Sequence, residues 1–417
     1  MIIKKIFNID IIGENMNYLL NPLIIYGVSF LLVLPIYGLE WSNLYPKLNT
    51  ELTIFIISSS IIAIILGKFF GLKKNKIDNE EFIPVKFSKL LCFTIIIYIG
   101  FILEFIYNGG IPLLLILNQT GFMYKDFGIP TFHVILITFT NFYTLLIFQV
   151  YIIRKKKKFL ILYLMLLLIS ILIYLRGNLI FMLIASLVIF FRYKVNISYK
   201  LYLKVFIGII LSLYLFGVIG NYRFMTSGSY KDYTSASVEI LNIGQATNSF
   251  KESVIPNEYF WSYIYISSSL ANLQYIVNNY TNVNNDDNIT LDEITNMCIS
   301  QLIPDFISKR YFELVDYKPK EAYLIVENLT LVTMYGLSYE YIGYLGLIIM
   351  FLYIVVFMII LMMLFRKSMF YNIIIANLFI ISIFSSFTNL LIFSGWTFQI
   401  LYFIILENRR IRKIFLY

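Results

Sequence analysis

Residues 159–191 read FLILYLMLLLISILIYLRGNLIFMLIASLVIFF and contain a single charged residue, Arg176. As one helix this stretch would be about 50 Å long, which exceeds the roughly 30 Å of a hydrocarbon core. Basic residues flank both ends, at Lys158 and Arg192. Because positive flanks favour the same side of a membrane, the stretch predicts a hairpin of two short membrane helices that meet near Arg176.

The composition of the whole chain agrees with a membrane location. Among the 417 residues, 59% are hydrophobic, 18% are aromatic and 14% are charged, and the mean hydropathy is +0.79. Soluble globular domains carry about 25% charged residues, so a soluble enzyme is excluded. We predict one integral membrane domain over residues 1–417, all-α and polytopic, with about ten transmembrane helices. The spans are expected at residues 18–37, 52–70, 90–106, 132–153, 159–175, 179–191, 205–219, 344–365, 373–387 and 391–406.

Clusters of basic residues lie between these spans in a regular order. If the N-terminus is cytoplasmic, every cluster faces the cytoplasm, as the positive-inside rule requires. The sequence therefore predicts that both termini are cytoplasmic. The last hairpin, over residues 373–406, is expected to make a tight external turn at Thr388 and Asn389. The clusters are Lys4 with Lys5, Lys73 with Lys74 and Lys76, residues 154–158, Arg192 with Lys194, Arg366 with Lys367, and residues 409–413.

Charge and cysteine content indicate neither a nucleic-acid partner nor a bound metal. The 33 basic and 24 acidic residues leave a formal net charge of +9, which in a membrane protein is a topology signal. Cys92 lies within an apolar run and Cys298 in a polar loop, so no disulfide or shared metal site is expected. The acidic stretch 282–288 lacks the glycine and the spacing of a calcium loop. No cofactor and no metal are therefore predicted.

The largest segment outside the spans covers residues 221–341 and holds more than half of the acidic residues of the chain. We expect a large external loop whose acidic and aromatic surface suits polar ligands better than anionic lipid. Within it, residues 258–279 carry apolar side chains every three to four positions, which is typical of a helix at the membrane interface. Residues 109–117 begin with Gly-Gly-Ile-Pro, are too short to span, and predict a re-entrant or interfacial segment.

Three arginines on the outer side are candidate anion-binding residues. Arg176 lies in the turn of the hairpin, where the shortness of both helices places its guanidinium below the outer interface. Arg223 directly follows the seventh span, and Arg310 lies in the external loop. A guanidinium at membrane depth is costly unless it is solvated or paired, and its fork of donors suits a phosphate or carboxylate. The alternative is an ordinary arginine that extends to water or to lipid phosphate.

Three titratable side chains near the outer ends of the spans are candidate proton carriers. His133, the only histidine, begins the fourth span, and Glu340 precedes the eighth. Either is a candidate catalytic base, although a lone histidine at an interface is more often a structural hydrogen-bonding residue. Glu104 lies one helical turn from the outer end of the third span and is expected either to pair with an arginine or to act as an acid.

Several short stretches follow one another along the chain in a familiar order. They are GGIPLLL at 109–115, Tyr124, FGIPTFH at 127–133, the Arg-Gly turn at 176–177, GNYR at 220–223 and NLTLVTMYGLSYEYIGYLG at 328–346. Together they resemble the O-antigen polymerases, the Wzy-type polymerases of oligosaccharide repeat units, over most of the chain. Members of that family often carry an Asp-Phe-Gly-like stretch before the eighth span, where this chain has Glu-Tyr-Ile-Gly at 340–343.

The resemblance implies a metal-independent glycosyltransferase of the bacterial inner membrane, with a fold similar to the GT-C-type membrane glycosyltransferases. Such an enzyme joins repeat units carried on undecaprenyl diphosphate into O-antigen or capsule at the periplasmic face. Arg176, Arg223 and Arg310 would bind the substrate diphosphate, and His133 or Glu340 would accept a proton from the incoming hydroxyl. The expected partners are the lipid-linked oligosaccharides, membrane lipid, and a chain-length regulator and a flippase of the same pathway.

Two other functions stay open on the sequence alone. An O-antigen ligase would share the spans, the outer loop and the arginines, but it would transfer finished polymer to the lipid A core. A polyprenyl-sugar flippase or a small-solute transporter would also have many spans and few charges, and would be expected to keep polar groups near the membrane midplane. Apart from Asn141, Gln149, Asn377 and Gln399, the predicted spans have almost none there.

Overall fold

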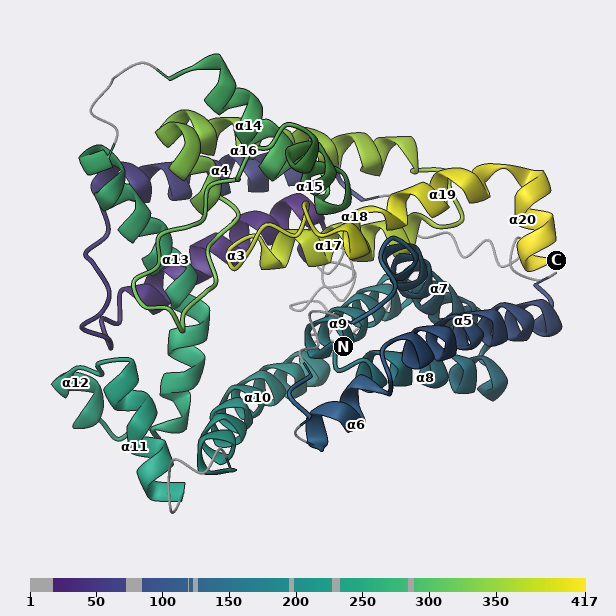
Figure 1. Cartoon of the computed structure of the whole chain (residues 1–417), viewed down its shortest axis with the longest axis horizontal. Coiled ribbons are helices and arrows are strands. Elements are labelled where there is room, and N and C mark those ends of the chain that lie inside the picture. Colours follow the sequence, from purple (N-terminus) through teal and green to yellow (C-terminus); the bar gives the residue numbers. More distant parts are fainter. Residues whose placement is uncertain are drawn as a thin grey trace, which may run out of the picture.

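The computed structural model of the protein describes residues 18–72, 85–118, 120–122, 127–194, 199–226, 233–283 and 289–417. Within these ranges every regular element is a helix, and one antiparallel bridge, between Ser42 and Ala246, is isolated (Figure 1). The all-α class is therefore confirmed for this part of the chain. The predicted basic clusters at 4–5 and 73–76, Tyr124, and most of the acidic stretch 282–288 lie outside the described residues.

Helices occupy all ten predicted spans. They are α3 (Pro22–Tyr37), α4 (Thr50–Phe69), α5 (Phe87–Tyr107), α7 (Phe132–Arg154), α8 (Lys157–Leu172), α9 (Arg176–Tyr193), α10 (Tyr199–Thr226), α16 (Gly336–Leu364), α17 (Tyr371–Phe384), and the pair α18 (Ser394–Thr397) and α19 (Gln399–Glu407). The short α6 (Pro112–Leu117) follows α5, and α20 (Arg409–Leu416) ends the chain.

Six of these elements are long and apolar enough to cross a membrane. They are α4, α5 continued by α6, α7, α9, the part Phe206–Arg223 of α10, and α16. Helices α3, α8 and α17 have only 16, 16 and 14 residues, and the tenth predicted span is divided between α18 and α19. The lengths and compositions support a membrane protein, while the number of ten spans stays a prediction.

The predicted hairpin over residues 159–191 is confirmed as the helix pair α8 and α9. α8 ends at Leu172, and α9 begins at Arg176. The turn is tight enough to place Tyr174 in the left-handed region, with φ of 59°. The hydroxyl of Tyr163 on α8 donates to Ser186 Oγ on α9 at 2.9 Å. Because α8 also packs against α7, the chain reverses twice and α9 runs in the same direction as α7.

The core of the bundle lies around α7 and α17. Every residue of α17 from 371 to 382 is buried, so this helix is enclosed by protein on all sides. It packs against α3, α9 and α16. At one end of α3 the hydroxyl groups of Tyr26 and Tyr335 are hydrogen-bonded to each other, which joins α3 to the start of α16. The centre of the bundle is therefore buried, and it can hold the side chains of a site in fixed positions.

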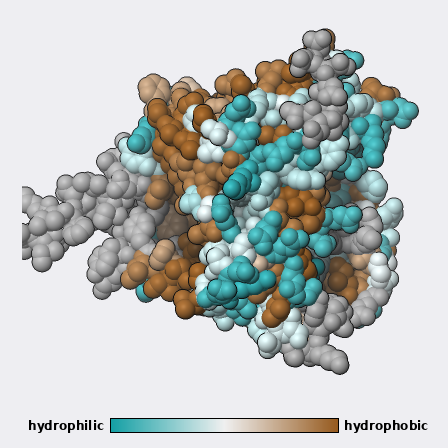
Figure 2. Space-filling model, turned by 90° about the vertical axis from the view of Figure 1, so that its left-hand side faces the viewer, coloured by the Kyte–Doolittle hydropathy of each residue, from teal (hydrophilic) through white to brown (hydrophobic). Residues whose placement is uncertain are grey.

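In the described part of the chain, five helices lie between α10 and α16, in the segment predicted as the external loop. They are α11 (Tyr233–Ile243), α12 (Asn248–Lys251), α13 (Glu258–Val283), α14 (Leu291–Leu302) and α15 (Asp305–Leu314). In Figure 1, α11, α12 and α13 lie at the end of the molecule opposite to α20. Seen from that end, hydrophilic residues gather over the middle of the face and hydrophobic residues lie along its margins (Figure 2). This distribution suits a polar cap on an apolar bundle.

Helix α13 begins at Glu258, as predicted, but it is buried along most of its length. Its polar side chains can be buried because they form hydrogen bonds with other parts of the chain. Asn272 Nδ2 donates to the carbonyl of Leu329 at 2.6 Å, and the side-chain oxygen of Gln274 accepts from the backbone N–H of Asn49 at 2.7 Å. Because these groups bind neighbouring backbone, α13 is a packing helix of the bundle and does not lie at the interface with one free face.

Helix α10 is attached to the bundle mainly through α13. A Cβ atom at Gly217 would lie 2.0 Å from the Glu258 carbonyl oxygen, and one at Gly220 would lie 2.6 Å from the Trp261 indole. Only glycine permits so close an approach. Trp261 Nε1 also donates to Asn221 Oδ1 at 2.7 Å. Much of the remaining surface of α10 exposes apolar side chains, as expected of a helix that faces lipid.

The predicted break between two helices at Thr388 and Asn389 is confirmed, but it is a longer, largely buried segment, residues 385–393, and not a tight turn; its external side stays a prediction. Non-helical backbone at membrane depth is tolerated only where other protein groups satisfy it. Here the external segment supplies those groups. Ser269 Oγ donates to Ser386 O (2.6 Å), the Asp305 N–H to Ile392 O (2.7 Å) and the Met334 N–H to Ser385 O (2.9 Å). In the other direction, Asn389 Nδ2 donates to Gln301 O (2.8 Å).

The side of the membrane on which the external segment lies can be tested by cysteine labelling. The side chain of Lys318, between α15 and α16, is 86% exposed. In a background with Cys92→Ser and Cys298→Ser, we expect Lys318→Cys to react with a membrane-impermeant maleimide added outside intact cells. A cysteine at the exposed Arg410 of α20 should react only after the inner membrane is permeabilised. The reverse pattern would overturn the predicted topology.

Candidate active site

The side chains of Glu104 and His133 meet between the end of α5 and the start of α7. His133 Nδ1 lies 2.9 Å from Glu104 Oε2 and 3.2 Å from Glu104 Oε1. The glutamate side chain is 0% exposed, whereas the histidine side chain is 24% exposed. Because an ionised carboxylate only accepts hydrogen bonds, the contact favours a proton on Nδ1 and leaves Nε2 as the acceptor of a neutral ring. Such a pair can take up a proton at Nε2 while the carboxylate stabilises the charged imidazolium.

The stretch Phe-Gly-Ile-Pro-Thr-Phe-His at 127–133 is folded around this pair. The Phe127 ring lies edge-on to the imidazole, with ring centroids 5.4 Å apart. The backbone N–H of Ile129 donates to Glu104 Oε1 at 3.3 Å. Gly128 has φ of 111°, and a Cβ atom there would lie 2.5 Å from His133 Cγ. The glycine is therefore required both by the backbone conformation and by the closeness of the ring.

Arg310 reaches the same end of α7 from α15. Its Nη2 donates to Thr131 Oγ1 at 2.7 Å, two residues before His133, and its Nη1 donates to the Phe306 carbonyl at 3.0 Å. The guanidinium also lies 3.8 Å from the centroid of the Phe306 ring. Arg310 remains exposed. It thus links the external segment to Thr131, at the start of α7, and brings a positive charge to the end of the helix that carries His133.

Arg176 lies deeper in the bundle than His133. Asn178 and Asn141 exchange two side-chain hydrogen bonds of 2.9 Å, which places the start of α9 level with Asn141 on α7. Asn141 is eight residues beyond His133, or about 12 Å along the helix. The Arg176 side chain is exposed and lies 4.7 Å from the centroid of the Tyr174 ring. No ion pair holds it among the described residues, so its donors are available to an anion.

Arg223 lines a separate pocket of about 280 Å³ beside α13. Trp261 and Tyr265 form an aromatic wall, and Ser268 and Asn328 contribute polar groups. Helix α10, which carries Arg223, packs on α11 and α13. In the described part of the chain, no hydrogen bond, ion pair or pocket joins this arginine to Arg176. The structure therefore does not bring the two together, although the sequence predicted a common depth at the outer side.

Glu340 lies in the first turns of α16, just before a break in the helix at Ile342 and Gly343. The side chain is 7% exposed, and Oε2 is buried with no hydrogen-bond partner among the described residues. Lys320 covers this position: its Nζ donates to the Glu340 carbonyl at 2.9 Å, and its backbone N–H donates to the Tyr341 hydroxyl at 3.0 Å. No contact within the described ranges connects Glu340 with the histidine pair, so the two predicted bases belong to different places.

The arrangement divides the predicted site residues into groups. His133 and Arg310 lie together at the start of α7, and Arg176 lies below them in the same helix group. Arg223 and Glu340 lie elsewhere. Sequence reasoning missed the partnership of Glu104 with His133, because it expected Glu104 either to pair with an arginine or to act as an acid. A signal was present: both residues lie near the outer ends of consecutive spans, which in a hairpin are neighbours.

Comparisons of the chain with protein-family models, with curated proteins and with solved structures found no match. Within the described ranges, no group of three or more His, Cys, Asp and Glu residues is placed to hold a metal ion. Cys92 and Cys298 are free thiols. The chemistry must therefore be argued from the geometry of the side chains.

Proposed function

We propose that the chain is a metal-independent membrane glycosyltransferase. It would polymerise oligosaccharide repeat units linked to undecaprenyl diphosphate at the outer face of the bacterial inner membrane. The observation that carries the proposal is the buried carboxylate of Glu104 bonded to the partly exposed imidazole of His133, with the Arg310 guanidinium bonded to Thr131 at the start of the same helix. The ordered resemblance to the O-antigen polymerases supports the same choice of reaction.

In the proposed step a hydroxyl of the incoming repeat unit loses its proton to His133 Nε2. The hydroxyl oxygen forms a bond to the anomeric carbon of the growing chain, and the bond from that carbon to the diphosphate oxygen breaks. Undecaprenyl diphosphate leaves with the electron pair. Glu104 would stabilise the imidazolium, because its buried carboxylate is bonded to Nδ1 at 2.9 Å.

The leaving diphosphate needs positive charge, and we assign that role first to Arg176. Its guanidinium is exposed at the turn of the α8 and α9 hairpin, at a greater depth than the histidine, where the lipid end of the donor would lie. Arg310 is placed to meet the charge that develops nearer to the base. The pocket beside Arg223 is more distant, and its Trp261 and Tyr265 rings suit stacking on sugar faces.

A deletion strain tests the proposal against the two alternatives. Cells without the chain should accumulate lipid-linked single repeat units and lack long surface polysaccharide. The units should be accessible from the periplasm, because a polymerase acts after they have crossed the membrane. Long polymer that stays on undecaprenyl diphosphate would indicate a ligase instead. Single units confined to the cytoplasmic face would indicate a flippase, and either result would overturn the proposal.

A further inference from the structure

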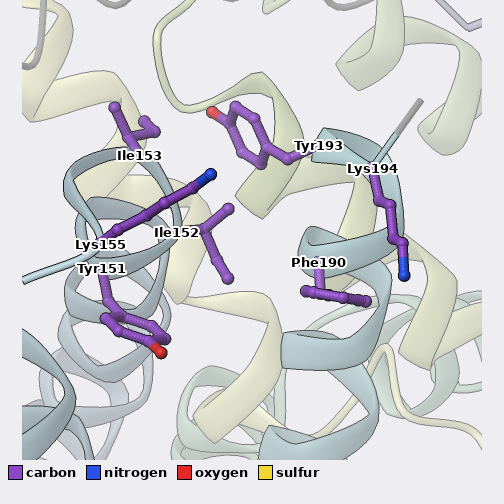
Figure 3. Close-up of a pocket in the computed structure, with 7 residues that line it drawn as sticks. All are labelled: Tyr151, Ile152, Ile153, Lys155, Phe190, Tyr193 and Lys194. Atoms are coloured by element: carbon purple, nitrogen blue, oxygen red, sulfur yellow. The ribbon is translucent and has the colours of Figure 1, made fainter. Parts of the chain in front are cut away.

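A second pocket lies between α7 and α9 at the ends of these helices opposite to His133. Its volume is about 600 Å³. Figure 3 shows the residues that line it, which come from the last turns of both helices and the residues after them. They are Tyr151, Ile152, Ile153 and Lys155 from the end of α7, and Phe190, Tyr193 and Lys194 from the end of α9. The pocket is independent of the proposed active site and of the proposed reaction.

Two lysines flank this pocket from opposite sides. Lys155 ends α7 in the left-handed region, with φ of 53° and ψ of 24°, a conformation that residues other than glycine rarely adopt. In Figure 3 its side chain extends across the pocket toward the Tyr193 hydroxyl. Lys194 directly follows α9, and its Nζ lies 5.3 Å from the centroid of the Phe190 ring. The Lys155 ammonium group thus lies over the cavity, and the Lys194 ammonium group lies at its edge, beyond Phe190 (Figure 3).

The two lysines give this pocket a positive charge that no carboxylate among the described residues pairs with. No acidic side chain in the described part of the chain forms an ion pair with Lys155 or Lys194. A lysine at a helix C-terminus is also favourable toward the helix dipole, and that role alone would explain the residue type. It would not explain a cavity of this size between the two lysines, walled by Ile152, Phe190 and Tyr193.

We propose that this pocket binds the headgroup of an anionic phospholipid. The phosphodiester would lie between Lys155 and Lys194, the Tyr193 hydroxyl would donate to a phosphate oxygen, and the glycerol and first methylenes would pack on Ile152 and Phe190. Basic pockets between transmembrane helices are suited to such headgroups, because ammonium groups and apolar walls match both parts of the lipid. On the topology predicted from the basic clusters, the pocket opens at the cytoplasmic leaflet.

Lipid binding to the purified full-length protein tests the proposal. In a neutral detergent, phosphatidylglycerol should bind and raise the unfolding temperature, whereas phosphatidylcholine should do neither. The double variant Lys155→Gln with Lys194→Gln should bind phosphatidylglycerol about 10- to 30-fold more weakly, since each lysine contributes at the membrane surface. The control is Lys156→Gln with Lys157→Gln, which removes the same charge from neighbouring exposed positions outside the pocket. It should bind as the unaltered chain does.

Two results would overturn the proposal. An equal loss of binding in both double variants would show general attraction to a basic surface without a site. Inorganic phosphate that displaces the lipid completely at millimolar concentration would show a site for a free anion instead of a lipid headgroup. A photoreactive phosphatidylglycerol tests the unaltered chain without any substitution. It should crosslink to the peptide that contains Phe190 and Tyr193, and crosslinks confined to other helices would contradict the assignment.

Discussion

His133→Gln is expected to abolish surface polymer while the protein stays folded in the membrane. Glutamine can still donate a hydrogen bond to the buried Glu104, so the carboxylate keeps a partner, but it cannot accept a proton. Loss of a general base lowers a rate by about 10²–10⁴-fold, which would leave single repeat units in place of long chains. The measurement is the polysaccharide ladder from strains with matched amounts of the chain.

Glu104→Gln is the companion variant. It keeps an acceptor for the Nδ1 proton of His133 but removes the charge that stabilises the imidazolium, so a smaller loss in the same direction is expected. Polymer of ordinary length in both variants would remove the pair from the mechanism and assign it a structural role. His133→Ala is less informative, because it leaves a buried carboxylate without its partner and endangers folding.

Arg176→Ala is expected to prevent polymerisation with little effect on insertion or abundance. The guanidinium is exposed, and its only described contact is with the Tyr174 ring, so its removal costs the fold about 1 kcal/mol or less. The substrate diphosphate, in contrast, would lose a donor pair in a site of low dielectric. Arg176→Lys keeps the positive charge but loses the paired donors of the guanidinium, so the polysaccharide chains should be markedly shorter than normal. Polysaccharide ladders and quantified membrane protein give both readouts.

The matched control is Arg410→Ala, which removes an exposed arginine from α20 at the other end of the bundle. It should leave the ladder unchanged. Arg223→Ala and Arg310→Ala place the other two predicted diphosphate residues in the same assay. If Arg176→Ala produces a normal ladder while Arg223→Ala does not, the diphosphate belongs in the pocket beside Trp261, and the assignment of Arg176 fails.

Helix positions were largely predictable because apolar composition and charged boundaries act locally along the chain. The hairpin of α8 and α9 and the first residue of α13 are examples. The surroundings of α13 were not predictable in this way. The helix was expected at the membrane interface, yet Asn272 and Gln274 bond Leu329 and Asn49, which come from distant parts of the chain. A polar residue on a helix indicates water or a buried partner, and only the tertiary arrangement decides between them.

The candidate site shows the same limit. Residue type and depth identified His133 and Glu104 separately, because titratable groups at the ends of spans are costly and stand out, whereas Arg310 was a candidate in the external loop. Which of these side chains contact one another depends on how each helix is rotated about its own axis. In helices that are hydrophobic all round, the spacing of apolar residues does not determine this rotation. Glu340 illustrates the error that follows. It has the depth and chemistry of a base, but the fold places it beneath Lys320, with no contact to the histidine.

The buried segment 385–393 has a consequence for how the chain is assembled during synthesis. Its backbone carbonyls are satisfied by groups from residues 269–334, which leave the ribosome earlier. On the predicted topology those residues are exported before α17 is made. On this topology, the hydrogen-bonding partners of the segment 385–393 are already on the outer side of the membrane when the last helices are inserted. A delay in export of the middle segment would leave α17 and α18 inserted but unable to reach their final depth.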